Sequence, residues 1–278
     1  MEKTTYIITG SAGYFATNFI TLLHSKGVLP SEIIKIDKEY GEEFDLTSIS
    51  FYPFFCTSSH IPDNGCVKII NFAADSFVPD SITNPEEVIK NNVGCLETVI
   101  ELNKFLIKKG FNSEIIHIST DEVHTQNPTP SAYVISKRKC EELCEQHKIK
   151  FMRPVNLVGN YQTQKHDCLM KLIHLQPDKV KIHGSGQQRR MFMNVKTASE
   201  LLYGFANSVF KRCLDITRPE FEKYRTHDLR IKDVITHFIE NCEEIDDPRE
   251  QYQDITYSQY SNLTNEPTIN DWLILSQK

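Results

Sequence analysis

Two adjacent carboxylic acids, Asp121 and Glu122, follow the apolar run Ile-Ile-His-Ile at residues 115–118. Such a run is typical of a buried strand, and carboxylates placed at its end lose favourable contact with water. Neighbouring carboxyl groups can act as a general acid and a general base when their surroundings separate their pKa values. The alternative interpretation is a structural turn with a helix N-cap.

A second candidate pair, Tyr133 and Lys137, is spaced four residues apart and therefore lies on one face of a predicted helix. Tyrosine normally has a pKa near ~10, too high for a base at neutral pH, and a nearby ammonium group favours the phenolate. With a hydroxyl donor such as Thr120, the pair can remove a proton from an alcohol while hydride leaves its carbon. Taken alone, this spacing more often marks a solvated surface pair.

A glycine-containing turn precedes both groups in the chain. Gly10, Gly13 and Ala16 follow a short β-branched run, and Asp37 ends the next apolar run. The glycines allow a tight turn and a close approach of the backbone to a pyrophosphate, and the aspartate can accept hydrogen bonds from an adenosine ribose. The pattern indicates NAD rather than NADP, because the carboxylate repels a 2′-phosphate. A simple strand-turn-helix corner is the alternative.

The elements that must position these residues alternate between strand and helix signals. The predicted strands lie at residues 4–10, 31–37, 66–75, 113–120 and 149–156, and the longer predicted helices at 88–108 and 131–147. This alternation predicts an α/β fold, a Rossmann-type doubly wound parallel sheet with helices on both faces. We expect residues 1–160 to form an NAD-binding domain, with about 188–212 packing back onto it. Residues 161–278 should form a small mixed C-terminal lobe that binds substrate.

Composition narrows the class of protein. The 278 residues are 40% hydrophobic and 24% charged, as in ordinary globular chains, and the net charge of −6 argues against nucleic-acid or anionic-membrane binding. Neither a signal peptide nor an apolar stretch long enough for a membrane span is evident. The eight cysteines include no C-x-x-C pair, so we expect reduced structural thiols, no metal and a cytoplasmic location.

Several motifs together resemble the extended short-chain dehydrogenase/reductase family. They are the glycine turn, NFAADSFVPDSI, HISTDEVH, AYVISK and HGSGQQRRMFMNV, and they run in order from about Thr4 to Val195. Within that family they look most like the nucleoside-diphosphate-hexose 4,6-dehydratases, typified by dTDP-glucose 4,6-dehydratase. The STDEV motif is the specific part, because epimerase relatives commonly have small residues in place of the two acids.

The resemblance implies a hydro-lyase reaction. Tyr133, assisted by Thr120 and Lys137, would take the sugar O4 proton as the C4 hydride passes to NAD. Glu122 would then remove the C5 proton while Asp121 protonates the departing C6 hydroxyl. Return of the hydride to C6 would give a 4-keto-6-deoxy sugar.

The resemblance also assigns binding residues. The cofactor set that it implies is Gly10, Gly13, Tyr14, Phe15, Asp37, Lys38, Asp45, Leu46, Phe72, Ala73, Ala74, Ser119, Tyr133 and Lys137. The implied substrate set is Ser76, Asn156, Lys171, Leu172 and Arg190, with Arg190 gripping the diphosphate. A homodimer through the helices near 88–108 and 131–147 is expected on the same ground.

Some positions depart from the family pattern. His124 stands where tyrosine is usual, and only ten residues separate Glu122 from Tyr133, where the family has a longer loop beside the sugar. A trimmed site could accept an N-acetyl group at C2, so UDP-N-acetylglucosamine joins UDP- and dTDP-glucose as a candidate substrate. It could also allow reprotonation at C5 from the other face, with His124 taking part. The other functions in contention are a nucleotide-sugar C4 epimerase, a decarboxylase and a non-catalytic NAD-binding protein.

Overall fold

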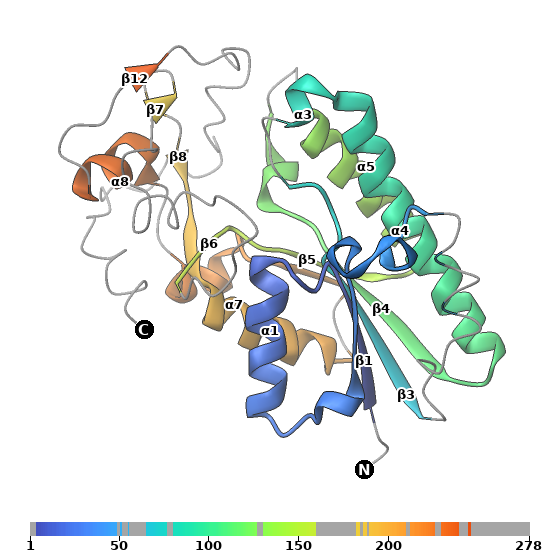
Figure 1. The fold of residues 1–278 in the computed structure, drawn as a ribbon. Coiled ribbons are helices and arrows are strands. Elements are labelled where there is room, and N and C mark those ends of the chain that lie inside the picture. Colours follow the sequence, from blue (N-terminus) through green and yellow to red (C-terminus); the bar gives the residue numbers. More distant parts are fainter. Residues whose placement is uncertain are drawn as a thin grey trace.

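A six-stranded parallel sheet forms the centre of the molecule, in the order β10-β5-β4-β3-β1-β2 (Figure 1). The computed structural model describes residues 4–48, 51, 55, 65–76, 80–126, 130–159, 182–183, 186–187, 189–209, 212–225, 229–238 and 244–245. The strands of this sheet are β1 Thr4–Thr9, β2 Ile33–Ile36, β3 Cys66–Asn71, β4 Asn112–Ile118, β5 Lys150–Arg153 and β10 Cys213–Asp215.

Helices cover both faces of the sheet. Helices α1 (Tyr14–Ser25) and α7 (Val195–Ala206) pack on one face, and α4 (Pro85–Lys108) and α5 (Ala132–Gln146) on the other (Figure 1). The predicted α/β doubly wound fold is therefore confirmed. The alternation of strand and helix signals predicted the fold correctly because parallel strands joined by right-handed crossovers can be arranged in few other ways.

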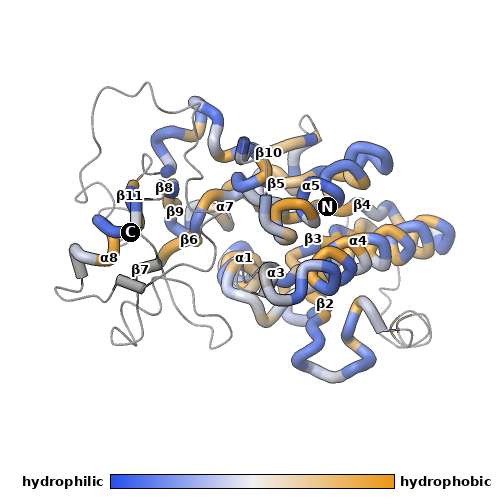
Figure 2. Tube along the Cα trace, turned by 90° about the horizontal axis from the view of Figure 1, so that it is seen from above, coloured by the Kyte–Doolittle hydropathy of each residue, from blue (hydrophilic) through white to orange (hydrophobic). Residues whose placement is uncertain are grey.

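Two hydrophobic cores explain why the layers form. Successive side chains of a strand point to opposite faces, so Ile8 enters the core with Phe19 of α1, whereas Ile7 enters the core with Leu102 of α4. All four side chains are fully buried. Figure 2 shows the apolar residues concentrated along the central strands and on the helices that cover them. The near-continuous apolar strands in the sequence reflect burial on both faces.

The order of the strands places a crevice at one edge of the sheet. From β1 the chain first adds β2 on one side and then β3 on the other, so the connections after β1 and β3 diverge. Ligands of open α/β sheets bind outside the carboxyl ends of the strands at such a switch point. Gly10, Phe72 and Ser119 follow β1, β3 and β4 there.

The predicted strand at 149–156 is divided at Pro154, and in this respect the prediction was wrong. Residues 150–153 form β5 in the central sheet, whereas β6 (Asn156–Val158) pairs with β9 (Phe192–Asn194) in a separate two-stranded sheet. Proline has no backbone N–H for a ladder hydrogen bond and disfavours a central strand position.

Shorter elements complete the part of the chain that the structure describes. Strand β7 (Ile182–His183) pairs with β12 (Glu244–Ile245), and β8 (Arg189–Arg190) pairs with β11 (Leu229–Arg230) beside α8 (Ile231–Phe238). The remaining helices are α3 Asp80–Thr83 and five 3-10 turns at Pro30–Glu32, Lys38–Tyr40, Glu42–Phe44, Asp121–His124 (η4) and Pro219–Tyr224. Among these described helices, none has the length and apolar character needed to cross a membrane.

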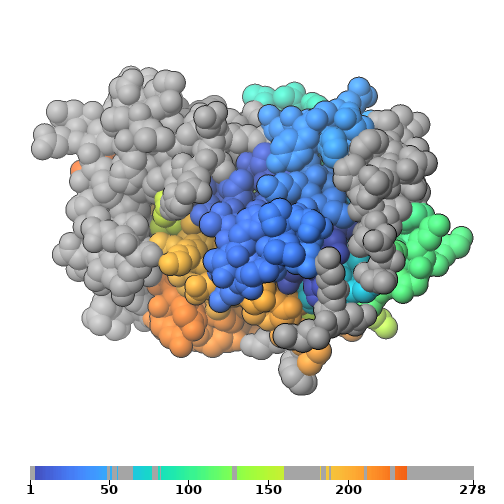
Figure 3. Space-filling view, turned by 60° about the horizontal axis from the view of Figure 1, so that its bottom comes forward, coloured from blue at the N-terminus to red at the C-terminus, as the bar shows by residue number. Residues whose placement is uncertain are grey.

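Helix α7 belongs to the stretch of about 188–212 that was expected to pack onto the NAD-binding domain, and it lies against α1. Strand β10 follows it and pairs with β5 at the edge of the sheet. Figure 3 shows the blue surface of the N-terminal residues lying directly against the orange surface near α7. Two lysines secure this joint. Lys68 Nζ bonds Glu114 at 2.5 Å and donates to the Ala206 carbonyl at the end of α7 at 2.6 Å, and Lys150 Nζ donates to the Ser208 carbonyl at 2.7 Å. The cations thus satisfy carbonyl groups at the helix C-terminus.

We expect Lys68→Met to lower the free energy of unfolding by about 2 kcal/mol, because it removes two hydrogen bonds from a buried amine. Chemical denaturation measures the change. Lys104→Met is the control, since Lys104 pairs with Glu101 at the surface, where their side chains are 54% and 62% exposed; its effect should stay within about 0.5 kcal/mol. Equal denaturation midpoints for the two variants would contradict the role of Lys68.

Candidate active site

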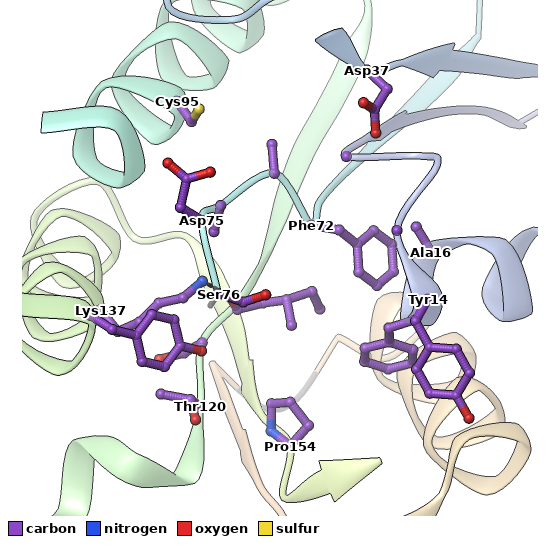
Figure 4. A pocket seen from close by; sticks show the side chains of 18 of the residues that line it. Tyr14, Ala16, Asp37, Phe72, Asp75, Ser76, Cys95, Thr120, Lys137 and Pro154 are labelled. Atoms are coloured by element: carbon purple, nitrogen blue, oxygen red, sulfur yellow. Dashed lines mark hydrogen bonds between the residues drawn. The ribbon is translucent and has the colours of Figure 1, made fainter. Parts of the chain in front are cut away.

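A cavity of about 670 Å³ occupies the crevice at the carboxyl ends of β1, β2, β3 and β4. In Figure 4, Asp37 lies at one end, Thr120 and Lys137 lie at the other, and Phe72 lies between them. The two ends of the cavity therefore present different side chains, as a ligand with distinct groups at its ends requires.

The glycine turn brings two chain segments into close contact. Gly10 has φ +62°, and a Cβ there would lie 2.7 Å from the backbone nitrogen of Ala73 after β3. Gly13 donates its N–H to the Gly10 carbonyl at 3.0 Å and precedes α1 without any side-chain cap. Gly13 and the first residues of α1, Tyr14 and Phe15, line the cavity, so the N-terminus of the helix lies beside it, as a dinucleotide site requires.

Asp37 is held rigidly at the end of β2. Its Oδ2 accepts from the Ala12 amide at 2.9 Å and its Oδ1 from the Glu39 amide at 3.1 Å. Lys38 Nζ lies 3.6 Å from Asp75 Oδ1, so its charge is engaged with that carboxylate. The buried carboxylate at the mouth of the cavity suits the hydroxyl groups of a ribose. The glycine cradle and this acid together fit NAD.

The two adjacent acids sit on a short 3-10 turn, η4. Thr120 caps the turn, its Oγ1 accepting from the Glu122 amide at 3.3 Å, and the Asp121 amide donates to the Pro154 carbonyl at 3.0 Å. Asp121 is 2% exposed, and both residues line the cavity. Glu122 Oε1 lies 3.7 Å from Nε of Arg190. Asp121 and Glu122 therefore form a capped turn, as the structural interpretation predicted, and the same two residues also line the cavity.

Helix α5 delivers the tyrosine and the lysine to the other side of the same cavity. Ser131 caps the helix, its Oγ accepting from the Val134 amide at 3.3 Å. Lys137 is buried and donates to the Ile118 carbonyl at 2.8 Å, and its Nζ lies 5.9 Å from the centre of the Tyr133 ring. These contacts place Lys137 beneath the end of β4 and beside the phenol.

The pKa of Tyr133 is raised above its usual value, first by burial and then by the charge of Glu122, while a hydrogen bond with Thr120 lowers it. Burial also lowers the pKa of Lys137. The expected depression of the tyrosine pKa by Lys137 is therefore outweighed, because removal from water disfavours both charged forms. A positive charge beside the phenol would be needed to offset this effect.

Asn92 connects two elements that border the cavity, and the motifs did not reveal it. Its Oδ1 accepts from the Asp75 amide at 2.6 Å, and its Nδ2 donates to the Asp75 carbonyl at 3.1 Å and to Ser136 Oγ at 2.9 Å. Ser136 in turn donates to the Tyr133 carbonyl at 2.7 Å. The buried amide therefore fastens the loop after β3 to α5. Its position four residues before Leu96, on the apolar face of α4, is the signal that could have revealed it.

Most of the predicted site residues line this one cavity. They are Gly10, Gly13, Tyr14, Phe15, Asp37, Lys38, Asp45, Leu46, Phe72, Ala73, Ala74, Ser76, Ser119, Thr120, Asp121, Glu122, Tyr133, Lys137 and Asn156. Ile36, Phe44, Cys95, Ile118, Pro154, Val155 and Leu157 line it as well and were not predicted.

Four predicted positions stand apart. Arg190 lies beside Glu122 and is not among the lining residues. Lys171 and Leu172 lie outside the described residues. His124 faces Asp215, with its Nε2 2.7 Å from the carboxylate, and does not line the cavity. Among the residues that the structure describes, no cluster of histidine, cysteine and acidic side chains could hold a metal ion.

The fold and site define a dinucleotide-binding α/β enzyme. Residues 6–208 match the model of the NAD dependent epimerase/dehydratase family, and the chain belongs to that family. NAD is accordingly its cofactor.

Three solved structures share the fold at low sequence identity. A dTDP-glucose 4,6-dehydratase from Streptomyces venezuelae, with NAD bound, has TM-score 0.70 and 17% identity over 97% of this chain and 94% of that one. TunA, an NDP-hexosamine 5,6-dehydratase, has TM-score 0.69 and 18% identity over 98% and 96%. A UDP-N-acetylglucosamine 4-epimerase from Methanobrevibacter ruminantium M1 has TM-score 0.64 and 15% identity over 99% and 96%.

A curated relative is also similar in sequence. It is an uncharacterized protein of Schizosaccharomyces pombe, 25% identical over 258 residues, covering 73% of this chain and 68% of that protein.

We expect Gly10→Ala to weaken NAD binding about tenfold or more, because the new methyl group would displace the Ala73 backbone at the cofactor cradle. Titration calorimetry measures the affinity. Gly27→Ala is the matched control: Gly27 also has positive φ, at +86°, but its Cβ would meet no atom within 4 Å. It should lose about 1 kcal/mol of stability through backbone strain and keep its NAD affinity. Equal NAD affinities for the two variants would rule out the proposed cradle.

Proposed function

We propose that this enzyme is a nucleoside-diphosphate-sugar 4,6-dehydratase, a lyase of deoxysugar biosynthesis that uses NAD in an internal redox cycle. Its substrate would be UDP- or dTDP-glucose or UDP-N-acetylglucosamine, and its product the 4-keto-6-deoxy sugar. The observation that carries the proposal is that Asp121 and Glu122 line the same cavity as Thr120, Tyr133 and Lys137.

The side chains divide the proton transfers between them. Bound NAD supplies a hydride acceptor and a positive charge that favours the tyrosine phenolate. Tyr133 takes the O4 proton, and its hydrogen bond with Thr120 stabilises the phenolate that does so. Lys137, fixed by the Ile118 carbonyl, holds a ribose hydroxyl beside the phenol.

The two carboxyl groups have different surroundings, as an acid and a base require. Asp121 is almost completely buried, an environment suited to a protonated group that gives its proton to the departing C6 hydroxyl. Glu122 lies beside the Arg190 guanidinium, and we assign it the role of the base that takes the C5 proton. The η4 backbone amides donate to the Thr120 hydroxyl and the Pro154 carbonyl. These contacts keep both carboxyl groups in place while each exchanges a proton with the sugar.

The geometry bears on the other candidate functions. A C4 epimerase or decarboxylase needs the tyrosine, lysine and threonine but no acid pair, and a non-catalytic NAD-binding protein needs none of them. Because His124 faces Asp215 and not the cavity, inversion at C5 is left out of the proposal. We also predict a cytoplasmic homodimer that forms through α4 and α5. We further predict that residues 161–278 form a substrate-binding lobe and that Arg190 contacts the diphosphate.

The purified protein should form a 4-keto-6-deoxy sugar from at least one of UDP-glucose, dTDP-glucose and UDP-N-acetylglucosamine. NMR in heavy water follows the products and should show deuterium at C5, because Glu122 exchanges the abstracted proton with solvent. Appearance of a 4-epimer or of a 5,6-dehydrated sugar would redirect the assignment within the family. No product from any of the three would refute it.

The variant Asp121→Asn/Glu122→Gln sharpens this experiment. It keeps the shape of η4 but removes the acid and the base, so dehydration should fall by a factor on the order of 10⁴ while oxidation at C4 continues. An epimerase would keep its full activity in the same variant.

Thr120→Val should shift the rising limb of the pH–rate profile for C4 oxidation upward by about one unit, and slow the reaction about tenfold at neutral pH. The sign follows from the Thr120 hydrogen bond, which lowers the raised pKa of Tyr133; its loss raises that pKa further and leaves less phenolate at a given pH. Thr120→Ser, which keeps the hydroxyl, should behave as wild type. An unshifted profile for Thr120→Val would show that the hydroxyl does not tune the base.

A further inference from the structure

The segment that carries the catalytic groups, Ser119–His124, is anchored at both ends by charged side chains outside the cavity. At its start, Ser119 Oγ donates to Oε1 of Glu141 on α5 at 2.5 Å. At its end, His124 Nε2 lies 2.7 Å from Oδ2 of Asp215 on β10. Neither Glu141 nor Asp215 lines the cavity, so both contacts hold the segment from the side away from the cavity.

One guanidinium joins the two anchors. Arg153 on β5 grips Glu141 with Nε and Nη2 at 2.9 and 2.6 Å, and its Nη1 donates to Asp215 Oδ2 at 3.0 Å. The fork geometry fixes both carboxylates relative to each other. The chain of bonds from Ser119 through Glu141, Arg153 and Asp215 to His124 therefore closes a ring around the catalytic segment.

Asp215 is the junction at which this ring meets the edge of the sheet. Its Oδ1 accepts from the Thr217 amide at 3.0 Å and from the Thr217 hydroxyl at 2.6 Å, while Oδ2 accepts from His124 and Arg153. Burial alone would raise the pKa of Asp215, but these hydrogen bonds hold it well below its usual range. The charged form of Asp215 is thus stabilised by its hydrogen bonds, and this carboxylate is the acceptor for His124.

Other contacts hold the groups of the first chemical step. Tyr133 and Lys137 are fixed by Ser136, Asn92 and the Ile118 carbonyl. The His124 contact instead acts two residues from Glu122, at the end of the 3-10 turn η4. Arg138 of α5 also holds this end, donating to the Val123 and Thr125 carbonyls. The His124 contact is the one that ties the turn to β10. Its loss would let the two acids move while the tyrosine and lysine stay in place.

We propose that His124 and Asp215 are positioning residues for elimination: through their contact, with Arg153 orienting Asp215, they hold Asp121 and Glu122 against C6 and C5 of the sugar. The role rests on the proposed 4,6-dehydratase function. A displacement of about 1 Å in a catalytic group can cost on the order of a hundredfold in rate, so loss of this one contact should be measurable.

His124→Phe tests the role, because it keeps a planar ring and removes the donor nitrogen. Mixing the NAD-loaded variant with substrate should give reduced nicotinamide, seen by its absorbance, at a rate within about twofold of wild type, while product forms ten- to a hundredfold more slowly. The reduced cofactor should therefore accumulate, which a general structural defect would not produce. His124→Gln, whose amide can still donate to Asp215, should restore most of the activity.

Two further variants complete the design. Asp215→Asn should show the same separation of the two steps and serves if His124→Phe does not fold. Glu142→Gln is the matched control, because Glu142 lines the same outer hollow as His124 but belongs to no bond of the ring; it should behave as wild type.

The outcomes distinguish the two inferences. A wild-type enzyme that forms no dehydrated product would overturn the proposed function and the positioning role with it. A wild type that dehydrates, beside a His124→Phe variant that slows both steps equally or neither, would overturn the positioning role alone.

Discussion

The close approach of Gly10 to the Ala73 backbone is the constraint on which the site depends. The connections after β1 and β3 can meet at the switch point only because the turn carries no side chain and accepts a positive φ. Both segments line the cavity at this contact, together with the first residues of α1. Every other ligand-facing group is arranged around this junction of two strand ends.

Burial fixes the side chains of the cavity in place, but it also disfavours their charged forms. The end of β4 and helix α5 bring Asp121, Tyr133 and Lys137 to one cavity. Burial there disfavours the charged forms of Tyr133 and Lys137. Local contacts offset this cost: Thr120 hydrogen-bonds the phenol, the Lys137 ammonium donates to the Ile118 carbonyl, and the Arg190 guanidinium forms an ion pair with Glu122. Proton transfer at neutral pH needs side chains whose pKa values are shifted by their surroundings and whose positions are fixed.

Much of this arrangement could be predicted from the sequence, because its signals are local or repeat regularly. The glycine spacing, Asp37 after the second strand and the helical spacing of Tyr133 and Lys137 each predict a geometry within one or two turns of chain. The division at Pro154 was missed because the apolar pattern continues through it. Asn92 and Asp215 were missed because their partners are distant: Asp215 meets His124 across 91 residues.

The sequence by itself therefore determined the fold class, the cofactor and many of the residues that line the cavity, since alternating apolar runs predict the strands and short motifs mark the residues at their ends. Only the tertiary structure decided the direction of the tyrosine and lysine pKa shifts, the contact of Arg190 with Glu122 and the orientation of His124. These depend on desolvation and on contacts between residues far apart in the chain, which exist only once the layers have packed.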